Sequence, residues 1–67
     1  MTMLKVIEVL AESEKSWEDA AKNAVKKASK TLNEIKSIYI ENFEASVEDD
    51  KIVKYRINAK ITFLLNE

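Results

Sequence analysis

The sequence predicts an α+β fold in which three antiparallel strands curl around one helix. Residues 16–35 carry apolar side chains at spacings of three and four, which is typical of one face of a helix. Residues 52–65 alternate between apolar and polar side chains, which is typical of a strand buried on one side. Two further apolar segments, at 4–10 and 38–47, flank the helix in the chain. The expected order is therefore strand, helix, strand, strand, in a single domain spanning residues 1–67.

The first half of the chain supplies one strand and the helix. Leu4–Leu10 is aliphatic on both alternating faces, which predicts a strand covered on both sides, and Ala11–Lys15 is a polar connection. Ser16 and Asp19 fit a capping box, so the helix is expected to begin at Trp17. The apolar face of this helix is rich in alanine, which lets a sheet approach closely. Its members are Trp17, Ala20, Ala21, Ala24, Val25, Ala28, Leu32 and Ile35.

The second half predicts a hairpin of two strands. Ile38–Val47 and Ile52–Leu65 are joined by only Glu48–Lys51, so the two strands must be antiparallel neighbours. The chain has no glycine, so Asp49 or Asp50 is expected to take the left-handed backbone conformation in the turn. The alternation in the first of these strands assigns its apolar side chains to two faces. Ile38 and Ile40 fall on one face, and Tyr39, Phe43, Ala45 and Val47 mostly on the other.

The last strand is long for so short a chain. At about 3.3 Å per residue, residues 52–65 would span roughly 46 Å, whereas a compact chain of this length has a radius of gyration of about 11 Å. The strand must therefore curl around the helix or be shared with neighbouring subunits. The chain has no cysteine or histidine, so disulfides and the common zinc sites cannot support its small core. Oligomerisation is the expected remedy.

Composition excludes several classes of function. The 11 basic and 12 acidic residues nearly balance, so no nucleic-acid surface is indicated. No apolar run reaches the length of a membrane span, and a cytoplasmic location is expected. Without histidine, cysteine or glycine, the chain lacks the usual general base, thiol nucleophile and phosphate loop. The sequence therefore predicts a protein that is not an enzyme.

A few side chains are candidates for binding. Glu48, Asp49 and Asp50 offer oxygen ligands for calcium, or simply form a solvated hairpin tip. The lysines on the polar side of the helix are expected to be solvated. Trp17 is more typical of a packing or subunit-contact residue than of a stacking platform. Arg56, on the polar face of the last strand, predicts an ion pair or a position lining an internal cavity of an assembly.

Five segments together resemble the dodecin family, and the likeness covers nearly the whole chain. They are Lys5–Val9, Ser16–Ala21, Asn23–Val25, Ala28–Leu32 and Tyr55–Phe63. The resemblance implies a three-stranded antiparallel sheet curled around one helix and a hollow dodecamer as the assembly. In many members, flavins such as riboflavin, FMN or FAD are stored at subunit interfaces. Trp17, Tyr55 and Phe63 would then serve packing or subunit contacts.

Departures from the family pattern fall on the flavin pocket, whose positions would be Ser37, Tyr39 and Arg56. Flavin-binding members carry a stacking tryptophan at the position that matches Ser37, and a glutamine at the position of Arg56. Serine cannot stack, and a guanidinium only donates hydrogen bonds. The usual glycines of the first loop and of the hairpin are Ala11 and Asp50.

This pattern is similar to the branch without the tryptophan, for which calcium binding has been proposed. The expected function is small-ligand binding and storage of the flavin type, with a degenerate flavin pocket that binds flavin weakly or not at all. A second hypothesis is flavin storage in which Tyr39 or Arg56 holds the flavin ring instead of a tryptophan. The alternatives are a calcium-binding shell or a purely structural assembly.

Overall fold

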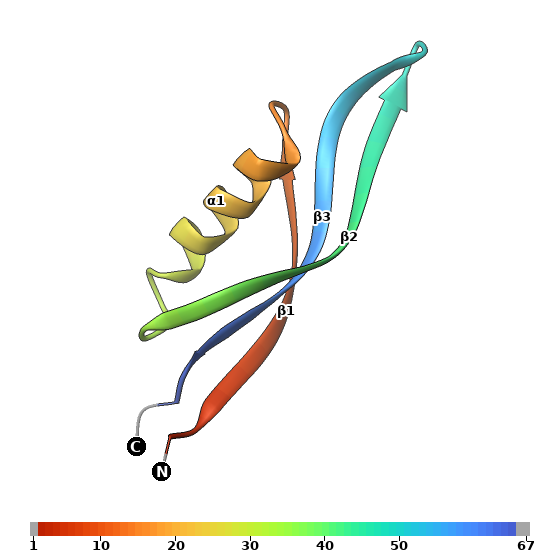
Figure 1. The fold of residues 1–67 in the computed structure, drawn as a ribbon. Helices are drawn as coiled ribbons and strands as arrows, with labels where there is room; N and C mark the ends of the chain where they lie inside the picture. The colour runs from red at the N-terminus through yellow and green to blue at the C-terminus, as the bar shows by residue number, and fades with distance from the viewer. Residues whose placement is uncertain (1, 66–67) are drawn as a thin grey trace.

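Three strands and one helix make up the computed structural model, which describes residues 2–65. The elements are β1 (Leu4–Ser13), α1 (Trp17–Ala28), β2 (Ile35–Glu48) and β3 (Lys51–Leu64). β3 is the central strand of a sheet with the order β1-β3-β2, and both neighbours pair with it in antiparallel fashion. α1 lies against one face of the sheet (Figure 1). The predicted α+β fold is confirmed.

The core lies where the middle of β3 meets α1. Ile57, Ala59 and Ile61 of β3 are completely buried, as is Ala20 of the helix. The alternation that the sequence predicts for this strand is therefore confirmed. Because Ala20 and Ala59 carry only a methyl group, helix and sheet approach closely. Partly buried residues complete the cluster: Val9, Ala11, Trp17, Ala21, Ile38 and Ile40.

The helix begins as predicted. The Ser16 hydroxyl accepts a hydrogen bond of 2.9 Å from the Asp19 amide, which satisfies one of the free amides of the first turn. The Asp19 carboxylate also accepts hydrogen bonds from the Ser13 hydroxyl at 2.6 Å and from the side-chain amide of Asn23 at 3.1 Å. These contacts fix the connection between β1 and the first turn of α1.

The helix ends earlier than its apolar pattern predicts. Leu32 and Ile35, which the sequence assigns to the apolar helix face, lie beyond Ala28. Leu32 is in a turn, with its amide bonded to the Ala28 carbonyl, and Ile35 opens β2 opposite Phe63. Glu34 reverses the chain with a φ of 39°. The spacing of Leu32 and Ile35 imitates a helical repeat, but one serves the turn and the other the sheet.

β1 is longer than predicted and is covered on one face only. It continues through Ser13 because Ala11–Ser13, which the sequence assigns to a connection, pairs with residues 55–57 of β3. Its face opposite the helix leaves Leu4 and Val6 about half exposed and Leu10 71% exposed. The prediction of a strand covered on both sides is wrong for the single chain, since α1 covers one face of the sheet.

Register shifts between β2 and β3 change which side chains face the helix. The register shifts between Ile40 and Asn42, so that Phe43 lies opposite Ile57 and Ala45 opposite Tyr55. Phe43 and Ala45 therefore share the helix side with Ile38 and Ile40, and their predicted grouping with Tyr39 is wrong. A bulge adds one residue to a strand and inverts the alternation beyond it. A further shift, between Ser46 and Val47, places Val47 opposite Ile52 and leaves Val53 of β3 without a partner in the ladder.

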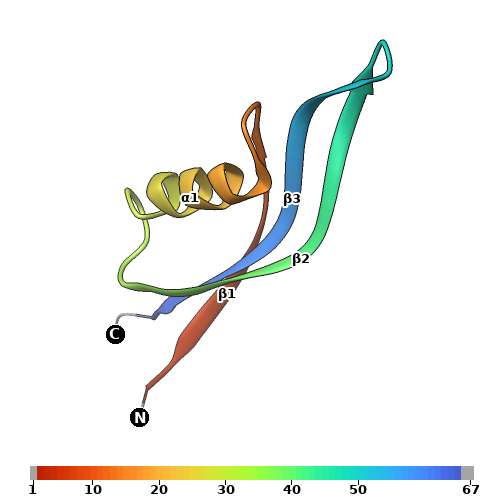
Figure 2. The same cartoon turned by 45° about the horizontal axis from the view of Figure 1, so that its top comes forward.

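The hairpin of β2 and β3 projects beyond the rest of the sheet. β1 ends opposite Tyr55, so residues 46–54, here called the arm, form a two-stranded extension (Figure 2). Asp49 and Asp50 both have positive φ, 52° and 64°, where the sequence predicts only one such residue. Positive φ at both central positions is the signature of a type I′ turn, which matches the twist of a two-residue hairpin.

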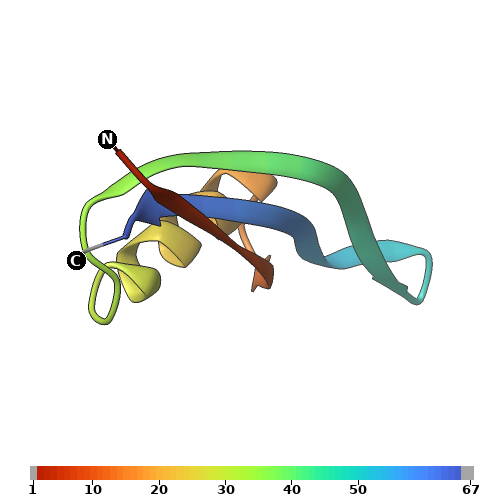
Figure 3. The ribbon, with the colours of Figure 1, turned by 90° about the horizontal axis from the view of Figure 1, so that it is seen from below.

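The resulting molecule is elongated and curved. Its principal extents are 52 × 20 × 13 Å, and its radius of gyration is 13.7 Å. Seen from below, the sheet bends around α1 before continuing into the arm (Figure 3). The long third strand therefore curls around the helix and also extends past it.

Candidate functional site

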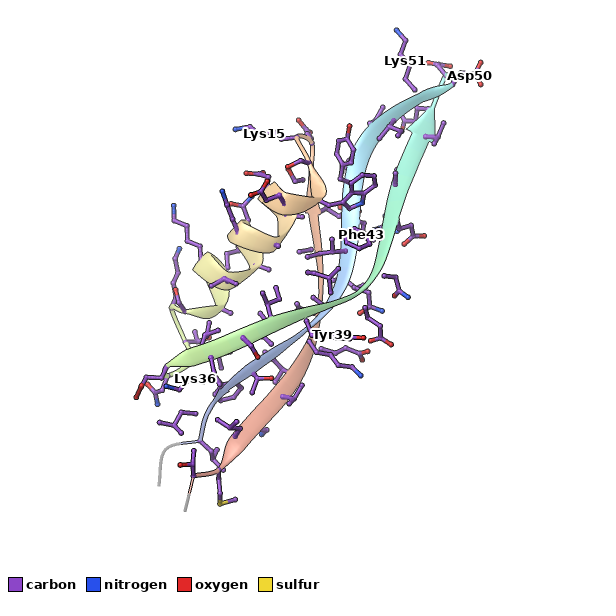
Figure 4. All side chains as sticks on the ribbon, in the orientation of Figure 1. Lys15, Lys36, Tyr39, Phe43, Asp50 and Lys51 are labelled. Carbon is purple, nitrogen blue, oxygen red and sulfur yellow. The ribbon has the colours of Figure 1, made fainter. Side chains whose placement is uncertain are left out.

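The face of the sheet that points away from α1, here called the outer face, carries the positions suggested for ligand binding. Ser37 and Tyr39 of β2 lie on it, opposite Thr62 and Lys60 of β3. Arg56 lies on it as well, in the middle of the sheet between β1 and β2. Phe43 is on the helix side; Figure 4 labels both Phe43 and Tyr39. All three positions of the suggested flavin pocket therefore lie on the outer face.

Arg56 is held by carboxylates from both neighbouring strands. Its Nε donates to Glu12 Oε2 at 2.8 Å, and its Nη2 lies 2.6 Å from the same oxygen. On the other side, Nη1 lies 3.3 Å from Glu44 Oε1. Lys54 adds a more distant contact, 3.9 Å, to Glu12. The guanidinium is thus the centre of an ion cluster that spans all three strands, and the ion pair expected from the sequence is present.

The cluster shifts the titration of its members. The hydrogen bond from Arg56, together with the positive charges of Arg56 and Lys54, lowers the pKa of Glu12 despite some desolvation. The hydrogen bond and charge of Glu12, and more weakly those of Glu44, raise the pKa of Arg56. Glu12 therefore stays ionised at more acidic pH than an isolated glutamate, and Arg56 stays charged.

Ser37 and Tyr39 lie far from Arg56 within one chain. Thr62, the partner of Ser37, is six positions from Arg56 on β3, which corresponds to about 20 Å along a strand. Ser37 and Arg56 therefore do not lie side by side in a single chain, although they are on adjacent strands. Tyr39 is 64% exposed, and its partner Lys60 forms an ion pair of 3.6 Å with Glu41.

Trp17 joins the start of the helix to both strands of the hairpin. Its ring meets Phe43 edge-on at 5.8 Å and Tyr55 edge-on at 4.9 Å between centroids. Its indole Nε1 donates a hydrogen bond of 2.9 Å to the Glu44 carbonyl. Phe63, also on the helix side, is half-buried and lies opposite Ile35 and Lys5. Trp17 and Tyr55 are thus packed against each other inside the chain.

The sequence alone did not identify Glu12, Glu44 or Phe43 as partners of these residues. Glu12 falls in a segment read as a connection, and the assignment of Phe43 to a face depended on an alternation that the bulge breaks. An arginine in a central strand is stabilised by carboxylates at the paired positions of its neighbours, but this signal becomes useful only once the register is known.

The acidic tip of the arm is exposed. Glu48, Asp49 and Asp50 are open to solvent around the turn. Within residues 2–65, no three carboxylates come together in one chain in a way that could hold a metal ion. A calcium site at this tip therefore stays a prediction and would need ligands from another chain. In the same part of the chain, no helix is long and apolar enough to cross a membrane.

Comparisons with known proteins give one consistent result. A sequence model of the dodecin family matches residues 3–66. The calcium dodecin of Mycobacterium tuberculosis is 30% identical over 63 residues, which cover 94% of this chain and 89% of that protein.

Solved dodecins share the fold. The structure of dodecin from Streptomyces coelicolor matches with a TM-score of 0.94 at 27% identity, covering 98% of this chain and 94% of that one. The crystal structure of the Mycobacterium tuberculosis calcium dodecin, described as calcium chelating with a novel calcium-binding site, matches with a TM-score of 0.83 at 28% identity, covering 96% and 91%. A mutant of Thermus thermophilus dodecin has a TM-score of 0.94 at 22% identity over both full chains, which speaks for the fold alone. This chain belongs to the dodecin family.

Proposed function

We propose that this chain is a non-enzymatic subunit of a homo-oligomer, expected to be a hollow dodecamer, that binds a small ligand between subunits but has a degenerate flavin pocket. The observation that carries the proposal is the engagement of Arg56 by Glu12 and Glu44. A guanidinium offers donors only, and here these donors already face two carboxylates. Such a group cannot give a flavin ring both halves of an amide contact.

Surface area supports an oligomer. The chain exposes 5187 Å², whereas a compact folded chain of this mass exposes about 4300 Å². Among the described residues, several large hydrophobic side chains are exposed: Met3, Leu4, Val6, Leu10, Tyr39, Phe43, Val47, Ile52 and Leu65. Side chains of this kind in such number are typical of surfaces that another subunit covers.

The distribution of the pocket positions supports binding between subunits. Ser37 and Arg56 are about 20 Å apart along the strand direction in one chain, so one ligand can touch both only if two chains contribute. The Ser37 side lacks an aromatic platform, and the Arg56 side is an ion cluster. Both halves of the pocket are therefore poorly suited to an isoalloxazine ring.

Flavin titration tests the degenerate pocket. Riboflavin and FMN are added to the purified oligomer, and flavin fluorescence is followed; we expect no quenching with submicromolar affinity. Ser37→Trp should tighten binding about two- to tenfold, the gain that ~0.5–1.5 kcal/mol of aromatic contact gives. Ser46→Trp is the matched control, because Ser46 is also on the outer face of β2 but lies in the arm.

Two outcomes would contradict this proposal. Submicromolar quenching by the unchanged protein would show that the pocket is functional. An equal gain from Ser37→Trp and Ser46→Trp would show that added tryptophan binds flavin without a pocket. In the first case, Tyr39→Leu and Arg56→Met would identify which residue replaces the stacking tryptophan, as in the alternative hypothesis in which one of them holds flavin.

Calcium binding by the assembled shell is the second candidate. The 30% identical relative named calcium dodecin favours it, as does the acidic tip of the arm, which symmetry would repeat. A ligand that binds only the native form stabilises it, by about 2.7 kcal/mol at a concentration 100 times Kd. The midpoint temperature of thermal unfolding should then rise with millimolar calcium and rise less with magnesium. The variant Glu48→Gln/Asp50→Asn should show no rise with calcium. The absence of a shift in the unchanged protein would remove this candidate.

If neither flavin nor calcium binds, a purely structural role of the assembly is the remaining candidate function. A cytoplasmic location stays a prediction in all three cases, and fractionation of cells that produce the protein would test it.

A further inference from the structure

A groove runs between the second half of α1 and β1. It has a volume of about 720 Å³ and lies open at one side. The apolar side chains that line it include Ile7 and Val9 of β1 and Ala24, Ala28 and Leu32 on the helix side, here called its floor. Three lysines also line it, Lys26, Lys27 and Lys30, here called its rim; the one acidic lining residue is Glu12, which is paired with Arg56. A groove of this size and lining is large enough for the side chains of a short peptide segment.

Within residues 2–65, the charge of the rim is not compensated by an ion pair. Among residues 2–65, the helix lysine that forms an ion pair is Lys22, with Glu18 at 3.6 Å, and none of the three rim lysines does so. Three positive charges beside an apolar floor therefore favour an occupant that is acidic and partly apolar.

The tip of the arm has the complementary charge, since its three acidic residues outnumber Lys51, the lysine that flanks the turn. The tip carries Glu48, Asp49 and Asp50, which form no ion pairs among the described residues. Directly behind the tip, Val47 is 62% and Ile52 50% exposed, paired on one face of the hairpin. In this part of the chain β3 pairs with β2 alone, because β1 ends opposite Tyr55. The arm is thus an acidic tip on an apolar stem with an open strand edge.

The arm cannot reach the groove of its own chain. It points away from α1 in both views, and the molecule is 52 Å long (Figures 1 and 2). The occupant that fits the groove is therefore the arm of a second copy.

We propose that the arm of one copy docks into the groove of the next, with its acidic tip among the three rim lysines and Val47 and Ile52 over the apolar floor. This inference deepens the proposed function, because it rests on the homo-oligomer. The contact joins two different surfaces, so each copy uses its arm on one neighbour and its groove on another. Head-to-tail contacts of this kind close into rings when the rotation permits.

Charge exchange between the two surfaces tests the proposal. The groove variant is Lys26→Glu/Lys27→Glu, and the arm variant is Glu48→Lys/Asp49→Asn/Asp50→Asn. Lysine and glutamate have similar helix propensities, and asparagine tolerates positive φ, so both elements are kept. Sedimentation velocity over a dilution series should show each variant dissociating at a protein concentration at least about tenfold higher than the unchanged chain, a factor that equals ~1.4 kcal/mol. Combining both sets of changes in one chain should restore assembly.

A matched control and a direct readout complete the design. Lys15→Glu/Lys22→Glu changes the net charge by the same amount as the groove variant, but neither residue lines the groove; it should assemble like the unchanged chain. A carbodiimide cross-linker, which joins lysine amines to carboxylates in contact, is applied to a mixture of isotopically light and heavy chains. Mixed-label peptides joining residues 26–30 to residues 48–50 are expected.

The outcomes separate this inference from the proposed function. An unchanged chain that sediments as a monomer at all concentrations overturns both. An unchanged chain that is oligomeric, with a combined variant no better than either single one, overturns only the docking. Cross-links that join the rim lysines to other carboxylates would likewise overturn the docking.

Discussion

At the scale of single residues, Arg56 is the centre of the ion cluster on the outer face. It lies on the central strand, so both neighbouring strands can place a carboxylate opposite it, and both do. Exposed ion pairs usually contribute little to stability, but a shared guanidinium with two hydrogen-bonded carboxylates holds three strands in one register. The sequence predicts the ion pair at Arg56 and leaves its partners unnamed, because strand register is a property of the folded sheet.

Glu12 should make the stability depend on pH at the acidic end. Its pKa is lowered in the folded chain from the ordinary 4.5, mainly by the hydrogen bond from Arg56. The folded state therefore favours the ionised form, and this contribution is complete above about pH 4.5 and is lost as the pH falls through the lowered pKa. Glu12→Gln should remove this part of the acid dependence in denaturant unfolding measured between pH 7 and pH 3.

The control for this experiment is Glu14→Gln. Glu14 is exposed, lies just beyond β1 and forms no ion pair among the described residues. All variants are compared at the same protein concentration, because the stability of an oligomer depends on it. Equal acid slopes for Glu12→Gln and the unchanged chain would show that the cluster is not formed in solution.

At the scale of elements, signals that act within a few residues were readable from the sequence, and those that depend on pairing were not. The cap at Ser16 and the alternation of β3 are local and correctly placed the start of the helix and the buried face. The bulge at Glu41 and the extension of β1 through Ser13 depend on which residues of β3 pair with these strands. The same holds for the ligand positions, since the distance between Ser37 and Arg56 follows from the register.

The arm turn offers a test of backbone strain. Asp50 has a φ of 64°, where a β-branched residue is strongly disfavoured and glycine is free. Asp50→Gly should be more stable than Asp50→Val by about 1–2 kcal/mol, the cost of the left-handed conformation. Both variants lose the same charge, so their difference in the free energy of unfolding, measured by denaturant at equal concentration, reports the backbone alone. Equal stabilities would mean that the turn is not type I′ in solution.

At the scale of the whole molecule, the single chain is more extended than a compact domain of the same length. Its radius of gyration of 13.7 Å exceeds the roughly 11 Å of a compact chain of this length. Its completely buried hydrophobic residues are few: Ala20, Ile57, Ala59 and Ile61 among those described. The strand that outruns the core extends into the part of the molecule that the proposed oligomer would cover, and the sequence predicts sharing or curling of this strand from its length alone.

A substitution at Leu10 should show whether another subunit covers the outer face of β1. It is 71% exposed on the outer face of β1, and full burial of a leucine in an interface would contribute about 1.5–3 kcal/mol. Leu10→Ser should therefore raise the protein concentration at which the oligomer dissociates by about tenfold or more in sedimentation velocity. Lys15→Ser, an exposed change off the sheet, should have no such effect. Identical behaviour of the two variants would exclude the outer face of β1 from the interface.

Glu44 connects the two sides of the sheet: its carbonyl receives the indole hydrogen bond of Trp17 on the helix side, while its carboxylate holds Arg56 on the outer face. The only tryptophan of the chain is therefore mechanically linked to the surface where a ligand would bind. A ligand that displaces the backbone at Glu44 should change the surroundings of the indole, and with them its emission. The fold thus contains its own optical reporter, usable in the unlabelled protein to screen ligands of any chemistry.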